Sequence, residues 1–334
     1  MFKMFKQKFD FIAIGDTTTD AFIRLKEASA HIDIDKGARE ICLKFADKIP
    51  YEDVIVVPAV GNSANAAVAA ARLDLKSALV SNIGGDYFGK ECLAVLKKEA
   101  VAVKFIKIHK DQKTNYHYVL WFEDDRTILI KHEEFEYELP DINSSGWIYL
   151  SSLGGNSSSF HKKVEEFLAD HPKIKVAFQP GTFQMKMGAE SLKGIYRRSD
   201  VFLCNKEESQ RILKTEENDI KKLLFMVREL GPKIVVITDG VKGAYADDGA
   251  NVWFMPPYPD PKPPFERTGA GDAFSSTFVV ALACGQSVED ALRWAPINSM
   301  SVVQQVGARA GLLSRPQLEQ YLKEAPSYYK PEKI

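Results

Sequence analysis

Short apolar segments alternate with helical segments along most of this 334-residue chain, and this alternation restricts the fold more than any other feature. The apolar segments are typical of buried strands and lie at 11–15, 78–81, 148–150, 176–178, 201–203 and 234–238. The segments between them have the apolar spacing of helices and lie at 63–73, 88–99, 160–168, 207–213 and 220–230. Such alternation predicts an α/β fold with a mostly parallel sheet covered on both faces, whose ligands bind beyond the carboxyl ends of the strands.

Two segments interrupt this alternation, at about 21–60 and 111–132. The first mixes apolar residues with many charges, and the second alternates apolar and polar residues over 114–131. Both patterns predict antiparallel excursions from the main sheet, which we expect to form a small lid together. The alternative is a pair of exposed hairpins with no role in a site. No Pro- or Gly-rich linker divides the chain, so we expect one domain over residues 1–334.

Composition and charge exclude several classes of protein. The formal net charge is −1, so no general basic field favours nucleic acid or an anionic membrane. No apolar run approaches the ~20 residues needed to span a bilayer, and the Lys-interrupted start does not resemble a signal peptide. The four cysteines lie far apart in apolar surroundings, which suits buried thiols in a reducing compartment. We therefore expect a cytoplasmic protein.

A Gly-Ala-Gly-Asp run opens the apolar stretch 273–284 and is the most informative motif for chemistry. The small residues Gly269, Ala270 and Gly271 allow backbone N–H groups to turn inward, at a helix start that favours negative charge. Asp272 places a carboxylate beside this anion hole. Phosphoryl transfer needs such a pair, because the amides hold charge while the carboxylate takes a proton from the attacking hydroxyl. The alternative is a glycine-rich turn with Asp272 as a helix cap.

Further polar residues follow the predicted strands. Asp20 can accept hydrogen bonds from substrate hydroxyls, although a lone Asp after a strand is also a common turn residue. Gly61 permits close approach of a ligand, and Asn65 offers a donor and an acceptor to a polyol, unless this segment only caps a helix. Asp86 fits a helix cap better than a ligand contact.

Two other strand ends fit a nucleotide and its metal. Asn205 and Glu208 have the spacing of a capping box, and they also suit a site that reaches Mg²⁺ through water. Thr238 and Gly240 end another strand in a turn whose backbone could contact nucleotide phosphates.

Taken together, these motifs resemble those of the ribokinase-like carbohydrate kinases, the PfkB family, from about Phe11 to Leu322. The strongest match is Thr-Gly-Ala-Gly-Asp-Ala-Phe at 268–274, the family's C-terminal signature. The other matches, in family order along the chain, are 61–69 with 71–73, then 85–89, and then 205–208.

The resemblance implies a ribokinase-like three-layer α/β/α sandwich with a small β-strand lid, through which some members dimerise. It implies that Asp272 is the catalytic base and that Gly269 to Gly271 form the anion hole. It assigns sugar hydroxyls to Asp20, Gly61 and Asn65, water-mediated Mg²⁺ to Asn205 and Glu208, and ATP phosphates to Thr238 and Gly240. It also places Asn298 at the start of the segment 298–308, which would border the adenine and a monovalent-cation site.

Three departures from the family pattern are visible. Val60-Gly61 stands where many members have Gly-Gly, and Gln179-Pro180-Gly181-Thr182 replaces a more usual Asp-Pro-Asn. Glu266-Arg267 stands where potassium-dependent members often carry Asp-Thr, which leaves a K⁺ requirement open. None of these departures removes an expected catalytic residue.

The function expected from the resemblance is ATP-dependent phosphorylation of a hydroxymethyl group on a small sugar. The alternative within the family is a nucleoside kinase, in which lid aromatics would stack on a base. The candidates for that stacking are Tyr116, Tyr118, Trp121 and Phe122. A non-catalytic sugar-binding regulator is the alternative from another class, since fold does not fix function.

Overall fold

A ten-stranded sheet forms the centre of the protein, and the computed structural model describes residues 8–26, 31–33, 40–123 and 125–334. Seven neighbouring strands pair in parallel: β7 (Ile106–His109), β6 (Ser77–Gly84), β1 (Phe9–Ile14), β10 (Ser145–Leu150), β11 (Lys175–Phe178), β12 (Val201–Asn205) and β13 (Ile234–Thr238). Three strands continue this sheet in antiparallel pairing beyond β13: β14 (Ala244–Asp247), β15 (Val252–Met255) and β16 (Glu332–Lys333). The predicted mostly parallel sheet is confirmed.

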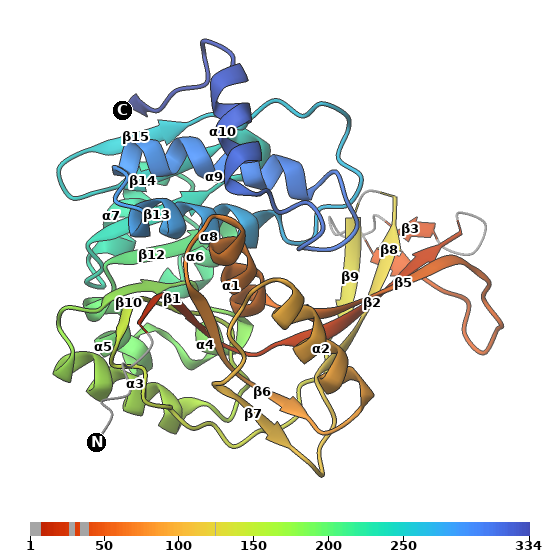
Figure 1. The fold of residues 1–334 in the computed structure, drawn as a ribbon. Helices are drawn as coiled ribbons and strands as arrows, with labels where there is room; N and C mark the ends of the chain where they lie inside the picture. The colour runs from red at the N-terminus through yellow and green to blue at the C-terminus, as the bar shows by residue number, and fades with distance from the viewer. Residues whose placement is uncertain (1–7, 27–30, 34–39, 124) are drawn as a thin grey trace, which may run out of the picture.

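Helices cover both faces of this sheet, because alternate strand residues enter two separate cores. In β1, Phe11 and Ala13 belong to one core, and Ile12 and Ile14 belong to the other. The first core is closed by α1 (Asn62–Arg72), α2 (Tyr87–Lys98), α8 (Ala270–Ala283), α9 (Val288–Val302) and α10 (Arg315–Glu324). The second is closed by α3 (Ser158–Asp170), α5 (Lys193–Arg198), α6 (Lys206–Leu213) and α7 (Ile220–Arg228). Figure 1 shows the resulting three layers.

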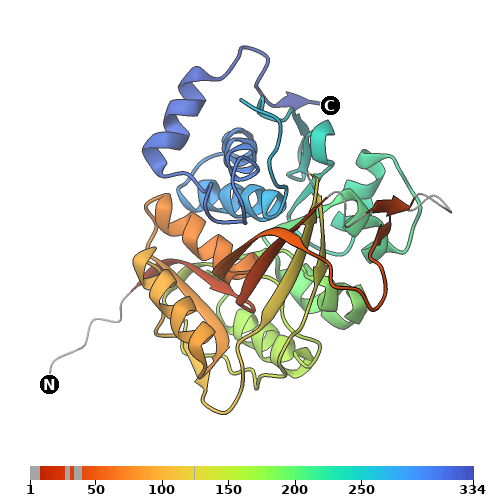
Figure 2. The ribbon, with the colours of Figure 1, turned by 90° about the vertical axis from the view of Figure 1, so that its right-hand side faces the viewer.

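A second sheet, here called the lid sheet, stands beside the main one. Its strand order is β5 (Tyr51–Val60), β2 (Thr18–Leu25), β8 (Tyr116–Phe122) and β9 (Asp125–Leu129). Figure 2 views the molecule from the lid side. The β2–β5 and β8–β9 pairs are antiparallel as expected, but β2 and β8 pair in parallel. Both strands follow parallel strands of the main sheet, β1 and β7, and therefore leave it in the same direction. The lid sheet also begins at Thr18, before the expected 21.

The register of the lid sheet decides which residues face the main body. Asp20 pairs with His117 across β2 and β8, so their side chains share one face. On the opposite face, Val56 and Tyr118 both pair with Ala21, and Leu129 pairs with Tyr118. A short separate ladder joins β3 (His31–Asp33) to β4 (Glu40–Cys42).

Candidate active site

A cavity of about 500 Å³ lies where the lid sheet meets the carboxyl ends of the central strands. Such an edge is where α/β sheets usually bind ligands. The predicted site residues that line it are Asp20, Gly61, Asn65, Asn205, Glu208, Thr238, Gly269, Gly271 and Asp272. The fold thus brings together side chains that are up to about 250 residues apart in sequence, because the strands that carry them end at one edge.

Helix α8 begins at the edge of this cavity with a glycine in the left-handed region. Gly269 has φ +84°, and a side chain there would collide with Ala308, so the turn requires glycine. No side chain caps this end of α8. The first N–H groups of a helix have no partner within the helix, and the helix dipole adds positive potential there. This end of α8 is therefore suited to hold an anion.

Asp272 lies in the first turn of α8 and is held by two amides. Its Oδ2 accepts a hydrogen bond from Asn65 Nδ2 at 2.8 Å, and its Oδ1 accepts one from Gln179 Nε2 at 3.3 Å. Burial raises the pKa of Asp272 and Asp20 adds to the effect, while the two amide donors lower it. A carboxylate that is oriented and more basic than usual is suited to accept a proton.

The contact from Gln179 was not predicted, although its segment stood out as a departure from the family pattern. Tyr149 donates a hydrogen bond from its hydroxyl to Gln179 Oε1. This bond fixes the orientation of the amide, so that its NH₂ group faces Asp272. Tyr149 lies in β10, and Gln179 directly follows the neighbouring strand β11. The sequence alone did not indicate that these two side chains meet.

The predicted acceptor-binding residues lie on the side of the cavity nearest the lid. Asp20 is buried, and its Oδ1 lies 3.3 Å from His117 Nδ1 in a geometry that makes no hydrogen bond. Asn65 Oδ1 also has no hydrogen-bond partner among the described residues. Gly61 has φ +108°, and a Cβ there would lie 2.9 Å from the Asp16 carbonyl oxygen. Buried acceptors without partners are costly, which indicates that a ligand supplies the missing donors.

Asn205 and Glu208 form the expected capping box at the start of α6. Asn205 Oδ1 accepts a bond from Glu208 N at 2.8 Å, and Glu208 Oε2 accepts one from Asn205 N at 2.8 Å. Both side chains also line the cavity, so capping does not exclude a role in ligand binding. Burial raises the pKa of Glu208, and the nearby Asp272 raises it further. A cation at this place would relieve that repulsion.

A second cavity of about 190 Å³ adjoins the first and shares Thr238, Arg267 and Gly271 with it. The predicted residues Gly240 and Ala270 line this second cavity. Much of its remaining lining is apolar, including Val241, Met255, Pro256, Pro257, Phe274 and Pro296. It is a narrow, largely apolar space beside the anion-binding end of α8.

Asn298 lines neither cavity. It is fully buried, its Nδ2 donates to Thr277 Oγ1 at 2.8 Å, and its Oδ1 accepts from Leu313 N at 2.9 Å. These bonds join α9 to α8 and to the segment that leads into α10. The structure therefore separates Asn298 from the other predicted site residues and gives it an internal role.

Several cavity residues were missed by the sequence analysis, among them His117, Arg126, His132 and Phe183. Strand alternation was the available signal, because Arg126 and Ile128 lie two residues apart on the cavity side of β9. The helix cap expected at Asp86 is present: its Oδ1 accepts from Gly89 N at 2.9 Å. Within the described ranges, no helix is long and apolar enough to cross a bilayer.

The model of the pfkB carbohydrate kinase family matches residues 30–315. The nucleoside kinase of Methanothermobacter thermautotrophicus is 26% identical over 261 residues, 75% of this chain and 80% of that protein. The ribokinase of Bacillus subtilis is 26% identical over 269 residues, 78% of this chain and 87% of that protein. Among solved structures, Arabidopsis thaliana ribokinase complexed with ribose and ATP gives a TM-score of 0.79 at 20% identity, over 95% of this chain and 99% of that one. Because the family model matches most of its length, the chain belongs to the pfkB family of carbohydrate kinases, as its motifs indicated.

Proposed function

We propose that the protein transfers the terminal phosphoryl group of ATP to a hydroxymethyl group of a small sugar. The observation that carries this proposal is the position of Asp272, a half-buried carboxylate with a raised pKa, in the first turn of α8. It lies in the same cavity as the anion-binding glycines and the unpartnered acceptors of Asn65 and Asp20. Asp272 would take the proton from the attacking hydroxyl, while the N–H groups at Gly269 to Gly271 hold charge on the moving phosphoryl group.

The nucleotide would lie across both cavities. Its phosphates would meet Thr238 and the start of α8, and its base would occupy the second cavity, whose apolar lining suits a flat ring. The wall of that cavity is rich in prolines, whose rings restrict the backbone. This rigidity favours a preformed site.

The family implies a magnesium ion, and the residues present fit one. Among the described residues no cluster of three or more His, Cys, Asp or Glu could enclose a metal by itself. Mg²⁺, however, keeps several waters and uses few protein carboxylates. Glu208, with its raised pKa, would hold the ion through water and Asn205 would position Glu208. When bound, the ion supplies charge neutralisation on the phosphates.

A potassium ion does not fit at Glu266. This residue is fully buried, and its carboxylate accepts hydrogen bonds from Thr268 N at 2.7 Å and Gly307 N at 3.3 Å. The Thr268 hydroxyl also donates to it. These donors stabilise the carboxylate and join the signature loop to the loop at Gly307 without a cation. We propose that the enzyme does not require K⁺.

A nucleoside kinase is the second candidate, favoured by the nucleoside kinase relative named above. None of the four lid aromatics considered for base stacking lines the acceptor cavity. Tyr118 is instead 48% exposed on the outer face of the lid sheet. This placement supports a sugar over a nucleoside. The catalytic base Asp272, whose carboxylate is held by two amide groups, supports a kinase over a non-catalytic regulator. Sugar binding alone does not need a catalytic base.

A coupled assay of ADP release tests the proposal, with ATP, Mg²⁺ and a panel of D-ribose, D-fructose, fructose 6-phosphate, adenosine and inosine. Turnover with a sugar supports it, and turnover with nucleosides alone supports the second candidate. Binding of a sugar, detected as a thermal shift, without any ADP release would support the regulator and contradict the kinase.

We also propose that two copies associate through the outer face of the lid sheet. Val56, Tyr118 and Leu129 form a row there across β5, β8 and β9, with exposed fractions of 47%, 48% and 53%. Light scattering on the wild type and on Val56→Lys tests this, since a charge in the row should leave only monomer. The four cysteines, all free, support action in the cytoplasm.

A further inference from the structure

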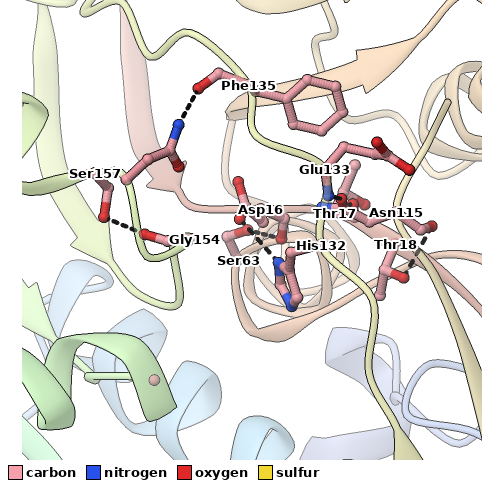
Figure 3. Close-up of polar contacts among 12 residues, drawn as sticks. Asp16, Thr17, Thr18, Ser63, Asn115, His132, Glu133, Phe135, Gly154 and Ser157 are labelled. Atoms are coloured by element: carbon pink, nitrogen blue, oxygen red, sulfur yellow. Dashed lines mark hydrogen bonds and ion pairs between the residues drawn. The ribbon is translucent and has the colours of Figure 1, made fainter. Parts of the chain in front are cut away.

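An Asp–His pair lies under the lid sheet, next to the 3.3 Å approach of His117 to Asp20 that makes no hydrogen bond. Asp16 follows β1 and is 5% exposed, and His132 follows β9. Figure 3 shows the ring of His132 in contact with the Asp16 carboxylate. Its Nδ1 atom lies 3.3 Å from Asp16 Oδ2. The rings of His132 and His117 are 5.1 Å apart. No step of the proposed phosphoryl transfer uses His132 or Asp16.

Asp16 is fixed by several partners. The Tyr137 hydroxyl donates to its two carboxylate oxygens, at 3.0 and 2.9 Å, and itself accepts a bond from Gly154 N at 2.9 Å. The backbone of Asp16 is held as well, since its N–H donates to Ser152 O at 2.8 Å and its carbonyl accepts from Ser63 Oγ at 3.0 Å. The carboxylate can therefore act as a rigid support for the imidazole of His132.

His132 is held on one side and open on the other. Its ring packs edge-to-face on Phe183 at 5.4 Å, and its side chain is 16% exposed and lines the 500 Å³ cavity. Within the described part of the chain, no group hydrogen-bonds to its Nε2 atom. With its proton on Nδ1, the neutral ring donates a hydrogen bond to the Asp16 carboxylate, which leaves a lone pair on Nε2. Nε2 is then a hydrogen-bond acceptor available to a ligand.

We propose that His132, oriented by Asp16, determines acceptor specificity by accepting a hydrogen bond at Nε2 from a hydroxyl of a neutral sugar. This inference rests on the proposed kinase function and deepens it. The unpartnered side-chain atoms of residues that line the same cavity include two oxygen acceptors, on Asp20 and Asn65, besides His117 Nε2. Three acceptors around one cavity match a ligand that presents several hydroxyl donors, whereas a carboxylate or phosphate would bring further acceptors. His132 is a binding residue here, and Asp16 is a positioning residue.

The test compares His132→Ala, His132→Gln and Asp16→Asn with a matched control, His171→Ala, which removes a histidine at the end of α3. The acceptors are D-ribose, D-fructose, fructose 6-phosphate and adenosine, and the readouts are kcat, the KM for each acceptor, the KM for ATP and the melting temperature. Loss of one neutral hydrogen bond is expected to raise the acceptor KM about 3- to 10-fold in His132→Ala, with the KM for ATP unchanged.

The two conservative variants distinguish recognition from packing. His132→Gln keeps an acceptor oxygen on the cavity side and should recover part of the affinity lost in His132→Ala. Asp16→Asn can present an NH₂ group to Nδ1, which moves the imidazole proton to Nε2 and turns the acceptor into a donor. It should therefore raise the acceptor KM as much as His132→Ala does. With a deoxy analogue that lacks the contacting hydroxyl, wild type and His132→Ala should have equal KM values.

An unchanged acceptor KM in His132→Ala, with a wild type that turns over a sugar, would overturn this inference and leave the kinase proposal intact. A variant that loses only melting temperature, with His132→Gln no better than His132→Ala, would make the residue structural and equally overturn it. Turnover of fructose 6-phosphate alone would overturn the neutral-sugar assignment. A wild type that neither binds nor phosphorylates any acceptor would overturn the proposed function and this inference with it.

Discussion

Replacement of Asp272 by Asn tests the centre of the proposed chemistry. The substitution keeps the shape of the side chain and removes its basicity. In the native structure Asn65 and Gln179 both donate to Asp272, so one of the two donors would face the new NH₂ group. Gln179 cannot turn without losing the bond from the Tyr149 hydroxyl, but Asn65 can, because its Oδ1 has no partner. The cavity can therefore accommodate the new amide side chain with little rearrangement.

The expected magnitude follows from this local accommodation. General base catalysis typically contributes ~10²–10⁴-fold, which corresponds to about 3–5 kcal/mol of transition-state stabilisation. Because the overall geometry is retained, most of the loss should appear in kcat. A turned Asn65 presents its NH₂ group in place of the Oδ1 that is proposed to accept a sugar hydroxyl, so the sugar KM should rise as well. The affinity for ATP should change little, since the second cavity and Thr238 are untouched.

Steady-state kinetics with the best sugar of the panel, together with ATP binding by calorimetry, measure both quantities. Asp170→Asn, on the exposed end of α3, is the control for the same chemical change elsewhere. A variant at Asp272 that retains wild-type kcat would eliminate it as the base. Equal losses in kcat and in ATP affinity would point to a disturbed fold instead.

The raised pKa of Asp272 allows a second, independent test, which is the pH dependence of activity and of stability. Since its pKa lies above the ordinary 3.8, wild-type kcat should fall on acidification at a pH above that value. The native state also holds this proton at pH values where the unfolded chain has released it. The contribution of Asp272 to the free energy of unfolding is therefore present at low pH and is lost as pH rises through the pKa of the native state. Asp272→Asn should consequently melt no lower than wild type at pH 8, despite its inactivity.

Other parts of the site give further expected outcomes. Glu208→Gln should raise the Mg²⁺ concentration needed for half-maximal rate more than it raises the sugar KM; a lower melting temperature at unchanged Mg²⁺ dependence would leave only the capping role. Asp20→Ala should abolish sugar-dependent turnover and leave nucleotide affinity near normal, and parallel losses of both would argue against it. Sugar binding should slow amide hydrogen exchange in 21–60 and 114–131, and uniform exchange would argue against a closing lid. Replacing K⁺ by tetramethylammonium should leave kcat unchanged if Glu266 joins its two loops directly; a marked fall in kcat would reveal a cation site.

The sequence predicted the main sheet closely because each element repeats a simple pattern. The strand expected at 234–238 is β13 without change, and the helix expected at 207–213 differs from α6 by one residue. The cavity could be predicted for a related reason. Polar residues that directly follow parallel strands must lie near one edge of the sheet, whatever their separation in sequence. A single domain over 1–334 stays a prediction.

The side chain of Asn298 faces the interior of the protein and does not line the second cavity. The resemblance placed its segment beside the nucleotide, and α9 does border the second cavity, through Pro296, Ser299 and Met300, with Val303 directly after its end. Positions 296, 299–300 and 303 follow one another at intervals of three and four, so these residues share one face of the helix and its continuation. Asn298 lies on another face, toward Thr277 of α8. The element was predicted in the right place, but the direction of one side chain depends on helix rotation, which the motif did not specify.

The contacts of the site that no motif indicated all connect separate elements. Gln179 meets Asp272 because β11 ends beside the start of α8, and His132 meets Asp16 because the chain returns from β9 past the end of β1. Each depends on how two segments pack, and neither residue has a neighbour in sequence that reveals its partner. In both contacts, a carboxylate or an imidazole is oriented by a group from another part of the chain.

The lid and the base are coupled through charge. Arg126 lies on the cavity side of β9, and its positive charge lowers the pKa of Asp272, whereas burial and Asp20 raise it. Asp20 on β2 and Arg126 on β9 both belong to the lid sheet, and their charges act on the pKa of Asp272 in opposite directions. If the lid closes on a sugar, water leaves the cavity and burial raises the pKa of Asp272 further, so its carboxylate is a stronger base at the moment when the acceptor hydroxyl is present. Exclusion of water and strengthening of the base would then be two results of one movement, and the positive charge of Arg126 limits how far the pKa of Asp272 rises.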